Sequence, residues 1–321
     1  MTTPADRVKA KGKDLGFGSV GIARAEALTP EGERLREWLA RGFHAGMSWM
    51  AERGEKREDP GRVLPGARSV IAVAMNYYTD AAHPAAGGKV SRYAWGDDYH
   101  DIMSERLDLF RAWLVAEFPG EEAKAYVDTG PVMDKAWAAR AGIGWQGKHT
   151  NVITREVGSW VFLGELLTTL DLAPDGAALD HCGTCRRCID ACPTGAIVEP
   201  YVVDSRLCLS YLTIEHRGPV EGEVTGRYEG WIYGCDTCQD VCPWNEKFAT
   251  PAREPGFAPR EGFAAPDIAA WERMTQAEFS TTFRGSPIKR AKREGLARNI
   301  RIVAGDPKPG PGASHGGEEG E

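Results

Sequence analysis

The chain has 321 residues, a formal net charge of −7 at pH 7, and a composition of 42% hydrophobic and 26% charged residues. This length allows one large core and a smaller module, and the negative total means that any contact with RNA needs a local basic patch. No apolar run approaches the ~18 residues that span a bilayer, and the first residues lack the apolar segment of a secretory signal, so we expect a cytoplasmic protein without a membrane anchor.

The first predicted elements are a helix, a glycine-rich turn and a strand. Residues 5–15 predict the helix, and Gly16-Phe-Gly18-Ser-Val-Gly21 matches the GxGxxG pattern. A dinucleotide-binding site needs a strand before these glycines and a helix after them. Here the order is reversed, so we interpret the glycines as a helix C-cap and a turn. Residues 31–54 then predict a longer helix, and residues 69–76 predict a buried strand.

A polar junction follows the next helix and strand. Asp97 or Asp98 is the expected N-cap of a long helix, and residues 123–127 predict a strand. Asp128 comes directly after that strand, and Pro131 suits the first turn of another helix. The end of a strand faces the ligand in α/β folds, but the residues alone favour an ordinary N-cap for Asp128.

A polar loop and a predicted hairpin complete the N-terminal part of the chain. Residues 151–155 and 159–170 are expected to pair as a hairpin. Lys148 and His149 lie in the preceding loop. They are either solvated loop charges or contacts to a substrate or cofactor, and the residues leave both interpretations open.

All eight cysteines lie between Cys182 and Cys242. The first four have the spacing C-x2-C-x2-C-x3-C-P, which is the arrangement of bacterial two-cluster ferredoxins. In that arrangement three cysteines hold one 4Fe-4S cluster, and the fourth begins a helix that leads to the other cluster. The pattern assigns one cluster to Cys182, Cys185, Cys188 and Cys242, and the other to Cys192, Cys208, Cys235 and Cys238.

Three other interpretations of the cysteines remain. Four-cysteine zinc sites share the CxxC spacing, but the first run places its thiols closer together than separate zinc loops do. Disulfides are not expected in a reducing compartment. The clusters could also be purely structural, although two neighbouring clusters more often conduct electrons.

We divide the chain into residues 1–175, a cluster module at 176–250, a helical segment at 251–304 and a tail at 305–321. The tail is rich in Gly, Pro and Glu, and we expect it to be disordered. A helix is expected to open at Ser286-Pro287. The stretch from Arg284 to Arg301 holds seven positive residues and one negative residue. This basic patch predicts an RNA contact, and a solvated amphipathic helix explains it equally well. The candidate RNA-binding residues are Lys289, Arg290, Lys292 and Arg293.

Several motifs together resemble the epoxyqueuosine reductase family over roughly residues 1–303. Beside the double cluster motif they are Val127-Asp128-Thr-Gly130, Trp95-Gly-Asp-Asp-Tyr-His100, Ala139-Arg-Ala-Gly142-Ile-Gly-Trp-Gln-Gly147-Lys148, Tyr233-Gly-Cys-Asp-Thr-Cys-Gln-Asp-Val-Cys-Pro243 and Ser286-Pro-Ile-Lys-Arg290. Each motif alone is unspecific, but the combination is specific. The resemblance implies an α/β (α+β) cobalamin-binding domain of nitroreductase-like type, then a ferredoxin-like module with two 4Fe-4S clusters and a short helical C-terminal segment.

The resemblance also implies a reaction and a set of partners. The enzyme would reduce epoxyqueuosine to queuosine at the wobble position of tRNA, using cobalamin and a low-potential electron donor of flavodoxin or ferredoxin type. Asp128 would then be the proton donor rather than an N-cap, with a pKa raised by a buried apolar setting. We expect a monomer that binds tRNA through the basic patch. Cobalamin would be bound by Arg57, Ser91, Arg92, Asp128, Val152, Leu163, Leu209 and Ser210.

Two other functions share part of this pattern. A cobalamin-dependent reductive dehalogenase would use the same cofactors, but its usual twin-arginine export signal is not seen here. An electron carrier without a substrate of its own would need only the cluster module, whereas roughly 175 residues precede the clusters in this chain.

Overall fold

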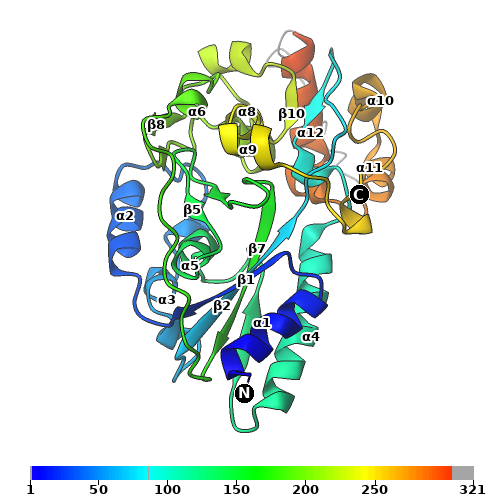
Figure 1. Cartoon of the computed structure of the whole chain (residues 1–321). Coiled ribbons are helices and arrows are strands. Elements are labelled where there is room, and N and C mark those ends of the chain that lie inside the picture. The colour runs from blue at the N-terminus through cyan, green and yellow to red at the C-terminus, as the bar shows by residue number, and fades with distance from the viewer. Residues whose placement is uncertain (1, 86, 306–321) are drawn as a thin grey trace, which may run out of the picture.

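The computed structural model describes residues 2–85 and 87–305. Its largest sheet has the strand order β1-β2-β7-β4, and every neighbouring pair is antiparallel (Figure 1). The strands are β1 (Ser19–Arg24), β2 (Ser69–Asn76), β7 (Val161–Thr168) and β4 (Ala123–Tyr126). The fold is therefore of mixed helix and sheet type, and the rule that ligands meet the carboxyl edge of a parallel sheet does not apply to it.

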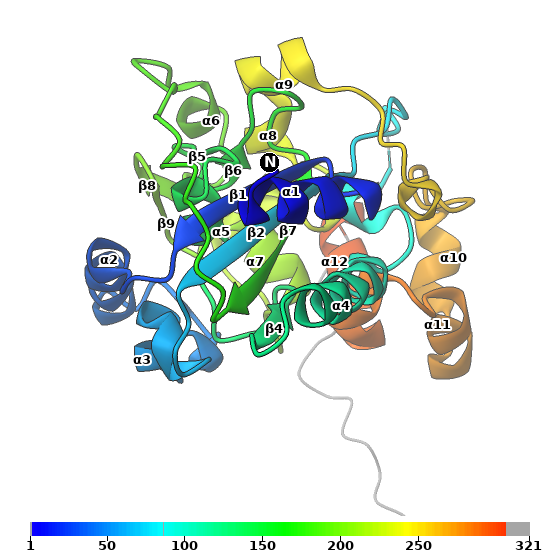
Figure 2. The ribbon, with the colours of Figure 1, turned by 60° about the horizontal axis from the view of Figure 1, so that its bottom comes forward.

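Helices cover both faces of this sheet, so β2 is buried on both sides and reads as a continuous apolar run. On one face, α1 (Pro4–Asp14) and α4 (Tyr99–Glu117) pack their apolar side chains against Ile71, Val73 and Leu166. On the other face, α5 (Asp134–Arg140) packs Trp137 and Ala138 against Val70 and Ala72. Figure 2 shows α1 and α4 side by side along the sheet. Asp98 is the N-cap of α4, as expected, and accepts a hydrogen bond from the backbone N–H of His100.

Two helix predictions are wrong at their boundaries. The helix expected at 31–54 ends early: α2 is Thr29–Ala40 and α3 is Gly54–Glu58, with turns between them. Gly42 has a φ of +69°, a left-handed conformation that ends a helix. Pro131 does not begin a helix, because α5 starts at Asp134 and its N-cap is Met133. Asp128 is therefore not an N-cap.

The predicted hairpin of 151–155 and 159–170 is also wrong. The first segment forms β6 (Val152–Ile153), which pairs with β5 (Trp145–Gln146). The second segment is β7 of the main sheet, and only the isolated bridge between Thr154 and Gly158 joins the two segments locally. The apolar face of β7 finds a larger partner surface in β2 and β4 than in the short β6.

The cysteine-containing part of the chain lies beyond one end of the main sheet (Figure 1). Its helices are short, and its small sheets pair β8 with β9 and β3 with β10. The helices are α6 (Arg187–Asp190), α7 (Leu209–Ile214), α8 (Thr237–Asp240) and α9 (Pro243–Phe248). The strands are β8 (Ile197–Glu199), β9 (Val202–Val203), β3 (Lys89–Val90) and β10 (Trp231–Tyr233).

The C-terminal helices are α10 (Ile268–Arg273), α11 (Gln276–Thr282) and α12 (Lys292–Ala304). Ser286 caps a 3-10 helix at Pro287–Ala291 rather than one long helix, because Lys292 has a φ of +63° at the junction. These helices share a core with Trp95 and with residues of β3 and β10. Three of the four segments predicted from the sequence therefore pack together. The division into segments stays a prediction. The tail that we predict to be disordered lies outside the described residues, apart from Gly305. No described helix is long and apolar enough to cross a bilayer.

Gly21 on β1 allows the sheet to touch the end of α5. A Cβ at this position would lie well inside van der Waals contact with the carbonyl oxygen of Ala141. We expect Gly21→Ala to lower the free energy of unfolding by about 1–3 kcal/mol, because the backbone of α5 must move away from the sheet. Chemical denaturation checks this. Gly226→Ala is the control, since a Cβ there meets no atom within 4 Å. Equal losses in the two variants would contradict the prediction.

Candidate active site and cluster cavities

The larger cavity, of about 340 Å³, lies between the main sheet and the cluster module. Along β7, Val161 and Leu163 alternate onto the α5 face, and both line the cavity. Five of the residues expected to bind cobalamin also line it, namely Ser91, Val152, Leu163, Leu209 and Ser210. Four cysteines complete its wall: Cys192, Cys208, Cys235 and Cys238.

A smaller cavity, of about 210 Å³, contains the other four cysteines: Cys182, Cys185, Cys188 and Cys242. The two cavities thus separate the cysteines into the same two sets that the spacing assigns. All eight cysteines are free in the structure. Cys208 and Cys242 are the N-cap residues of α7 and α9.

The chemistry of these thiols fits metal ligation. Burial, reinforced by neighbouring cysteines, raises the pKa of Cys188 to about 11 and of Cys235 to about 12. Such thiols lose their protons when they bind a metal ion. Burial raises the pKa of Cys208, and the nearby backbone N–H groups of Tyr211 and Ser210 oppose that rise. The backbone N–H of Ala196 donates a hydrogen bond to the Cys192 sulfur at 3.2 Å. Hydrogen bonds of this kind stabilise sulfur that carries negative charge.

Asp128 lies in a strained loop directly after β4, with a φ of +55°. Its Oδ2 accepts a hydrogen bond from the Tyr99 hydroxyl at 3.2 Å and lies 3.2 Å from His100 Nε2. The other ring nitrogen of His100, Nδ1, lies 2.8 Å from Asp98 Oδ1. His100 therefore sits between two carboxylates. The ring of Tyr99 packs against Tyr93, which lines the larger cavity, so this group borders the cavity although Asp128 does not line it.

The charges of this group differ from expectation. The hydrogen bond from His100 lowers the pKa of Asp128 and outweighs the opposing effect of burial. Burial lowers the pKa of His100, but the bonds to Asp128 and Asp98 outweigh it and raise the pKa to about 9. The prediction of a raised pKa for Asp128 is therefore wrong. The proton of the pair resides on His100 at neutral pH, and sequence reasoning missed this residue. The motif Trp95–His100 that carries it was the available signal.

A second carboxyl pair lies beneath this group. Glu165 of β7 is fully buried, and neither of its oxygens has a hydrogen-bond partner among the described residues. Burial raises the pKa of Glu165 well above its ordinary value, and the nearby Asp134 raises it further. Arg57 faces the same region. Burial lowers its pKa, and Asp134 and Asp128 oppose that effect. Its Nε is buried and has no hydrogen-bond partner in the part of the chain that the structure describes. Arg57 does not line the larger cavity.

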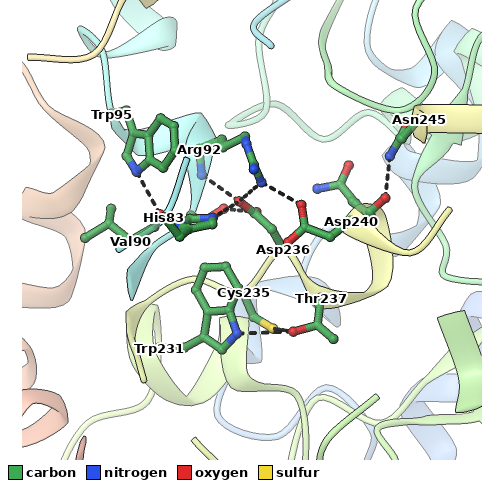
Figure 3. Close-up of polar contacts among 12 residues, drawn as sticks. His83, Val90, Arg92, Trp95, Trp231, Cys235, Asp236, Thr237, Asp240 and Asn245 are labelled. Carbon is green, nitrogen blue, oxygen red and sulfur yellow. Dashed lines mark hydrogen bonds and ion pairs between the residues drawn. The ribbon is translucent and has the colours of Figure 1, made fainter. Parts of the chain in front are cut away.

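Arg92 is placed by an ionic network beside the second cysteine set (Figure 3). Its guanidinium lies 2.6 Å from Asp240 Oδ1 and 3.5 Å from Asp236 Oδ2, and its backbone N–H donates to Asp236. The Ser91 hydroxyl donates to the other oxygen of Asp236 at 2.5 Å. Asp236 is fully buried between Cys235 and Cys238. Arg92 is not among the residues that line the larger cavity. Its expected contact with cobalamin stays a prediction.

Lys148 and His149 are not solvated loop charges, since both are buried. Lys148 Nζ donates to the backbone carbonyls of Gly183 at 2.6 Å and Cys185 at 2.8 Å. It thereby holds the loop that carries the first cysteines. His149 lines both cavities. Burial, aided by the charge of Lys135, lowers the pKa of His149 to about 4.

The four candidate RNA-binding residues of the basic patch have different environments. Arg290 forms three hydrogen bonds with Glu215 and lies over the ring of Trp49, at 5.4 Å from its centroid. Arg293 donates to the backbone carbonyl of Met274 at 3.4 Å. Lys289 and Lys292 are exposed, and neither has an ion-pair partner among residues 2–85 and 87–305. Of the four candidate residues, these two lysines are therefore the ones that remain available to a ligand.

The His100 proton predicts a pH dependence. If the Asp128–His100 pair supplies a proton, activity should be retained below pH 9 and lost as the pH rises through the raised pKa of about 9. This is the direction for a base whose pKa is raised, because the proton is bound below that value. The measurement is the rate of substrate reduction between pH 7 and pH 10. A His100→Gln variant should lose this alkaline limb. An unchanged limb in that variant would contradict the assignment.

Comparison with known proteins gives the family. A family model described as a 4Fe-4S double cluster binding domain matches residues 181–245, and one described as "Epoxyqueuosine reductase QueG, DUF1730" matches residues 57–129. An epoxyqueuosine reductase of Synechocystis sp. is 47% identical over 84% of this chain and 93% of its own length. One from Gloeobacter violaceus is 47% identical over 95% of this chain and 97% of its own.

Solved structures agree with these relatives. A crystal structure of epoxyqueuosine reductase with a tRNA-Tyr epoxyqueuosine-modified stem loop has a TM-score of 0.87 and 32% identity, over 93% of this chain and 80% of the other. A Bacillus subtilis epoxyqueuosine reductase, described with its aspartate-bearing catalytic loop swung out of the active site, has a TM-score of 0.84, 30% identity and the same coverage. The resemblance inferred from the motifs is confirmed, and the chain belongs to the epoxyqueuosine reductase family.

Proposed function

We propose that this protein reduces epoxyqueuosine to queuosine in tRNA. The observation that carries the proposal is the likeness, over nearly the whole chain, to a solved epoxyqueuosine reductase bound to an epoxyqueuosine-modified stem loop. The cysteine sets in two neighbouring cavities support two 4Fe-4S clusters as the source of electrons. No second function is proposed, because relatives of near-complete coverage carry the name of this enzyme rather than that of a dehalogenase or a carrier.

Cobalamin is the proposed ligand of the larger cavity. Its wall combines aliphatic side chains of Val152, Leu163 and Leu209 with the hydroxyls of Ser91 and Ser210. Such a surface fits a large, flat and mostly apolar ring with polar groups at its edge. When bound, cobalamin supplies a reduced cobalt centre that can engage an epoxide carbon. The second cysteine set in the same wall would place a cluster beside it.

Asp128 and His100 are the proposed route of protons. Conversion of an epoxide to an alkene consumes two electrons and two protons and releases water. Asp128 would protonate the oxygen that leaves carbon, and the His100 Nε2 proton would pass to Asp128 across their 3.2 Å contact. Asp98 fixes the imidazole through Nδ1, so that Nε2 stays directed at Asp128. Arg57, Asp134 and Glu165 lie close enough to this route for each to interact electrostatically with Asp128.

An anaerobic assay tests the proposal. The protein is reconstituted with iron and sulfide, supplied with cobalamin and a strong reductant, and mixed with tRNA containing epoxyqueuosine. Queuosine is expected only when both cobalamin and clusters are present. Bound iron without cobalamin uptake and without product would overturn the proposed function and leave an electron-transfer protein.

The exposed lysines of the basic patch are proposed to contact tRNA phosphates. We expect Lys289→Glu/Lys292→Glu to weaken tRNA binding and to reduce the salt dependence of log K by about one unit for each lysine lost. Binding is measured at several salt concentrations. Lys11→Glu, on α1, is the control for net charge, and its effect is compared with half of the effect of the double variant. The patch assignment fails if both variants bind tRNA as the unaltered protein does.

The remaining partners are proposed from the same family resemblance. The electron donor would be a low-potential protein of flavodoxin or ferredoxin type, because the clusters must be reduced one electron at a time. We also propose that the enzyme acts in the cytoplasm as a monomer.

A further inference from the structure

His149 occupies a position between the two cysteine sets. It is 4% exposed, and it lines both the larger and the smaller cavity. Its ring therefore lies where the walls of the two proposed cluster sites meet. A polar side chain buried at such a place needs a partner for each of its nitrogens, or it costs stability.

Only one of the two ring nitrogens has a partner within the described part of the protein. His149 Nδ1 accepts a hydrogen bond from the backbone N–H of Asn151 at 3.2 Å. Because Nδ1 accepts, the ring proton must be carried by Nε2. His149 Nε2 is buried and has no hydrogen-bond partner among the described residues. It is thus a buried N–H donor that lacks an acceptor in this part of the polypeptide.

Three contacts turn this donor toward the smaller cavity. Nδ1 faces Asn151, which belongs to the wall of the larger cavity and not of the smaller one. The carbon between the nitrogens, Cε1, shares the space above Gly147 with Ile153, which lines only the smaller cavity. The neighbouring Lys148 donates from Nζ to the backbone carbonyls of Gly183 and Cys185, in the loop that carries the first cysteines. The loop of His149 therefore packs directly on the first cysteine set.

We infer that His149 Nε2–H donates a hydrogen bond to a sulfur of the 4Fe-4S cluster held by Cys182, Cys185, Cys188 and Cys242, and thereby raises the reduction potential of that cluster. Hydrogen bonds to cluster sulfurs stabilise the reduced form, whose sulfurs carry more negative charge. The cluster gains one electron, and the proton stays on His149. This cluster would then accept electrons more readily from the external donor. The inference rests on the proposed pair of clusters.

Two substitutions of similar size separate the two nitrogens. The first variant is His149→Asn, because the shorter amide side chain should keep an acceptor near the position of Nδ1 and lose the distant donor. His149→Gln is the matched control, because its longer side chain can place an amide N–H near the position of Nε2. Both variants are reconstituted anaerobically, and iron and acid-labile sulfide are measured first. The potential of each cluster is then determined by redox titration monitored by electron paramagnetic resonance.

We expect His149→Asn to disfavour reduction of the first cluster about tenfold, which is a fall of about 59 mV for one electron, while the second cluster is unchanged. His149→Gln should remain close to the unaltered protein. An exchangeable proton coupled to the reduced first cluster should be visible by electron-nuclear double resonance and should vanish in His149→Asn.

Three results overturn the inference. They are unchanged potentials in His149→Asn with both clusters bound, a shift confined to the second cluster, and an equal shift in His149→Gln. The last would mean that altered packing of the loop is responsible. Absence of clusters from the unaltered protein would instead refute the proposed function, so the two failures can be told apart by iron content alone.

Discussion

Asp128→Asn is expected to reduce turnover of epoxyqueuosine-containing tRNA by about 10²–10⁴-fold, the usual contribution of a positioned acid or base. An amide has nearly the shape of the carboxylate, so the loop and its bond from the Tyr99 hydroxyl should persist. The amide cannot take the proton of His100 and pass it on. The single-turnover rate is measured with prereduced enzyme, so that delivery of electrons does not limit the reaction.

The matched control is Asp108→Asn on the exposed side of α4, where the carboxylate forms an ion pair with Arg111 at 3.5 Å. It should retain the full rate. Cobalamin binding and iron content should be equal in both variants, and the pH profile of any residual activity in Asp128→Asn should lack the limb near pH 9. A full rate in Asp128→Asn with intact cofactors would remove Asp128 from the route of protons.

Cys208→Ala and Cys242→Ala are expected to abolish turnover, each through a different cluster. Cys208 lines the larger cavity with the second cysteine set, and Cys242 lines the smaller cavity with the first. Loss of one ligand should reduce bound iron from about eight atoms toward about four in each variant. Spectra of the two variants should therefore show complementary clusters, the first cluster in Cys208→Ala and the second in Cys242→Ala.

The same spectra test the exchange of ligands between the two cysteine runs. If Cys242 belonged to the cluster of its own run, with Cys235 and Cys238, both variants would lose the same cluster. That result would overturn the assignment made from the spacing. Cobalamin binding should weaken more in Cys208→Ala, because that residue lies in the wall of the proposed cobalamin cavity.

The sequence alone correctly predicted those elements whose signals lie within one short segment. The apolar run at 69–76 is β2 at those bounds, and Asp98 caps α4 because its side chain bonds to a backbone N–H two residues later. The cysteine spacing was equally informative. A short loop can bring three thiols together only for one cluster, so the distant fourth ligand has to come from the other run.

Contacts between distant segments decided the rest. The pairing of β7 with β2 and β4 rather than with β6 depends on which partner buries more apolar surface, and no local signal encodes that choice. The pKa of Asp128 depends on His100, which is 28 residues away in sequence and comes from the start of another helix. Hydrogen bonds, burial and charge act through space. The sequence therefore indicated Asp128 as the proposed proton donor, whereas only the tertiary structure placed the proton of the pair on His100.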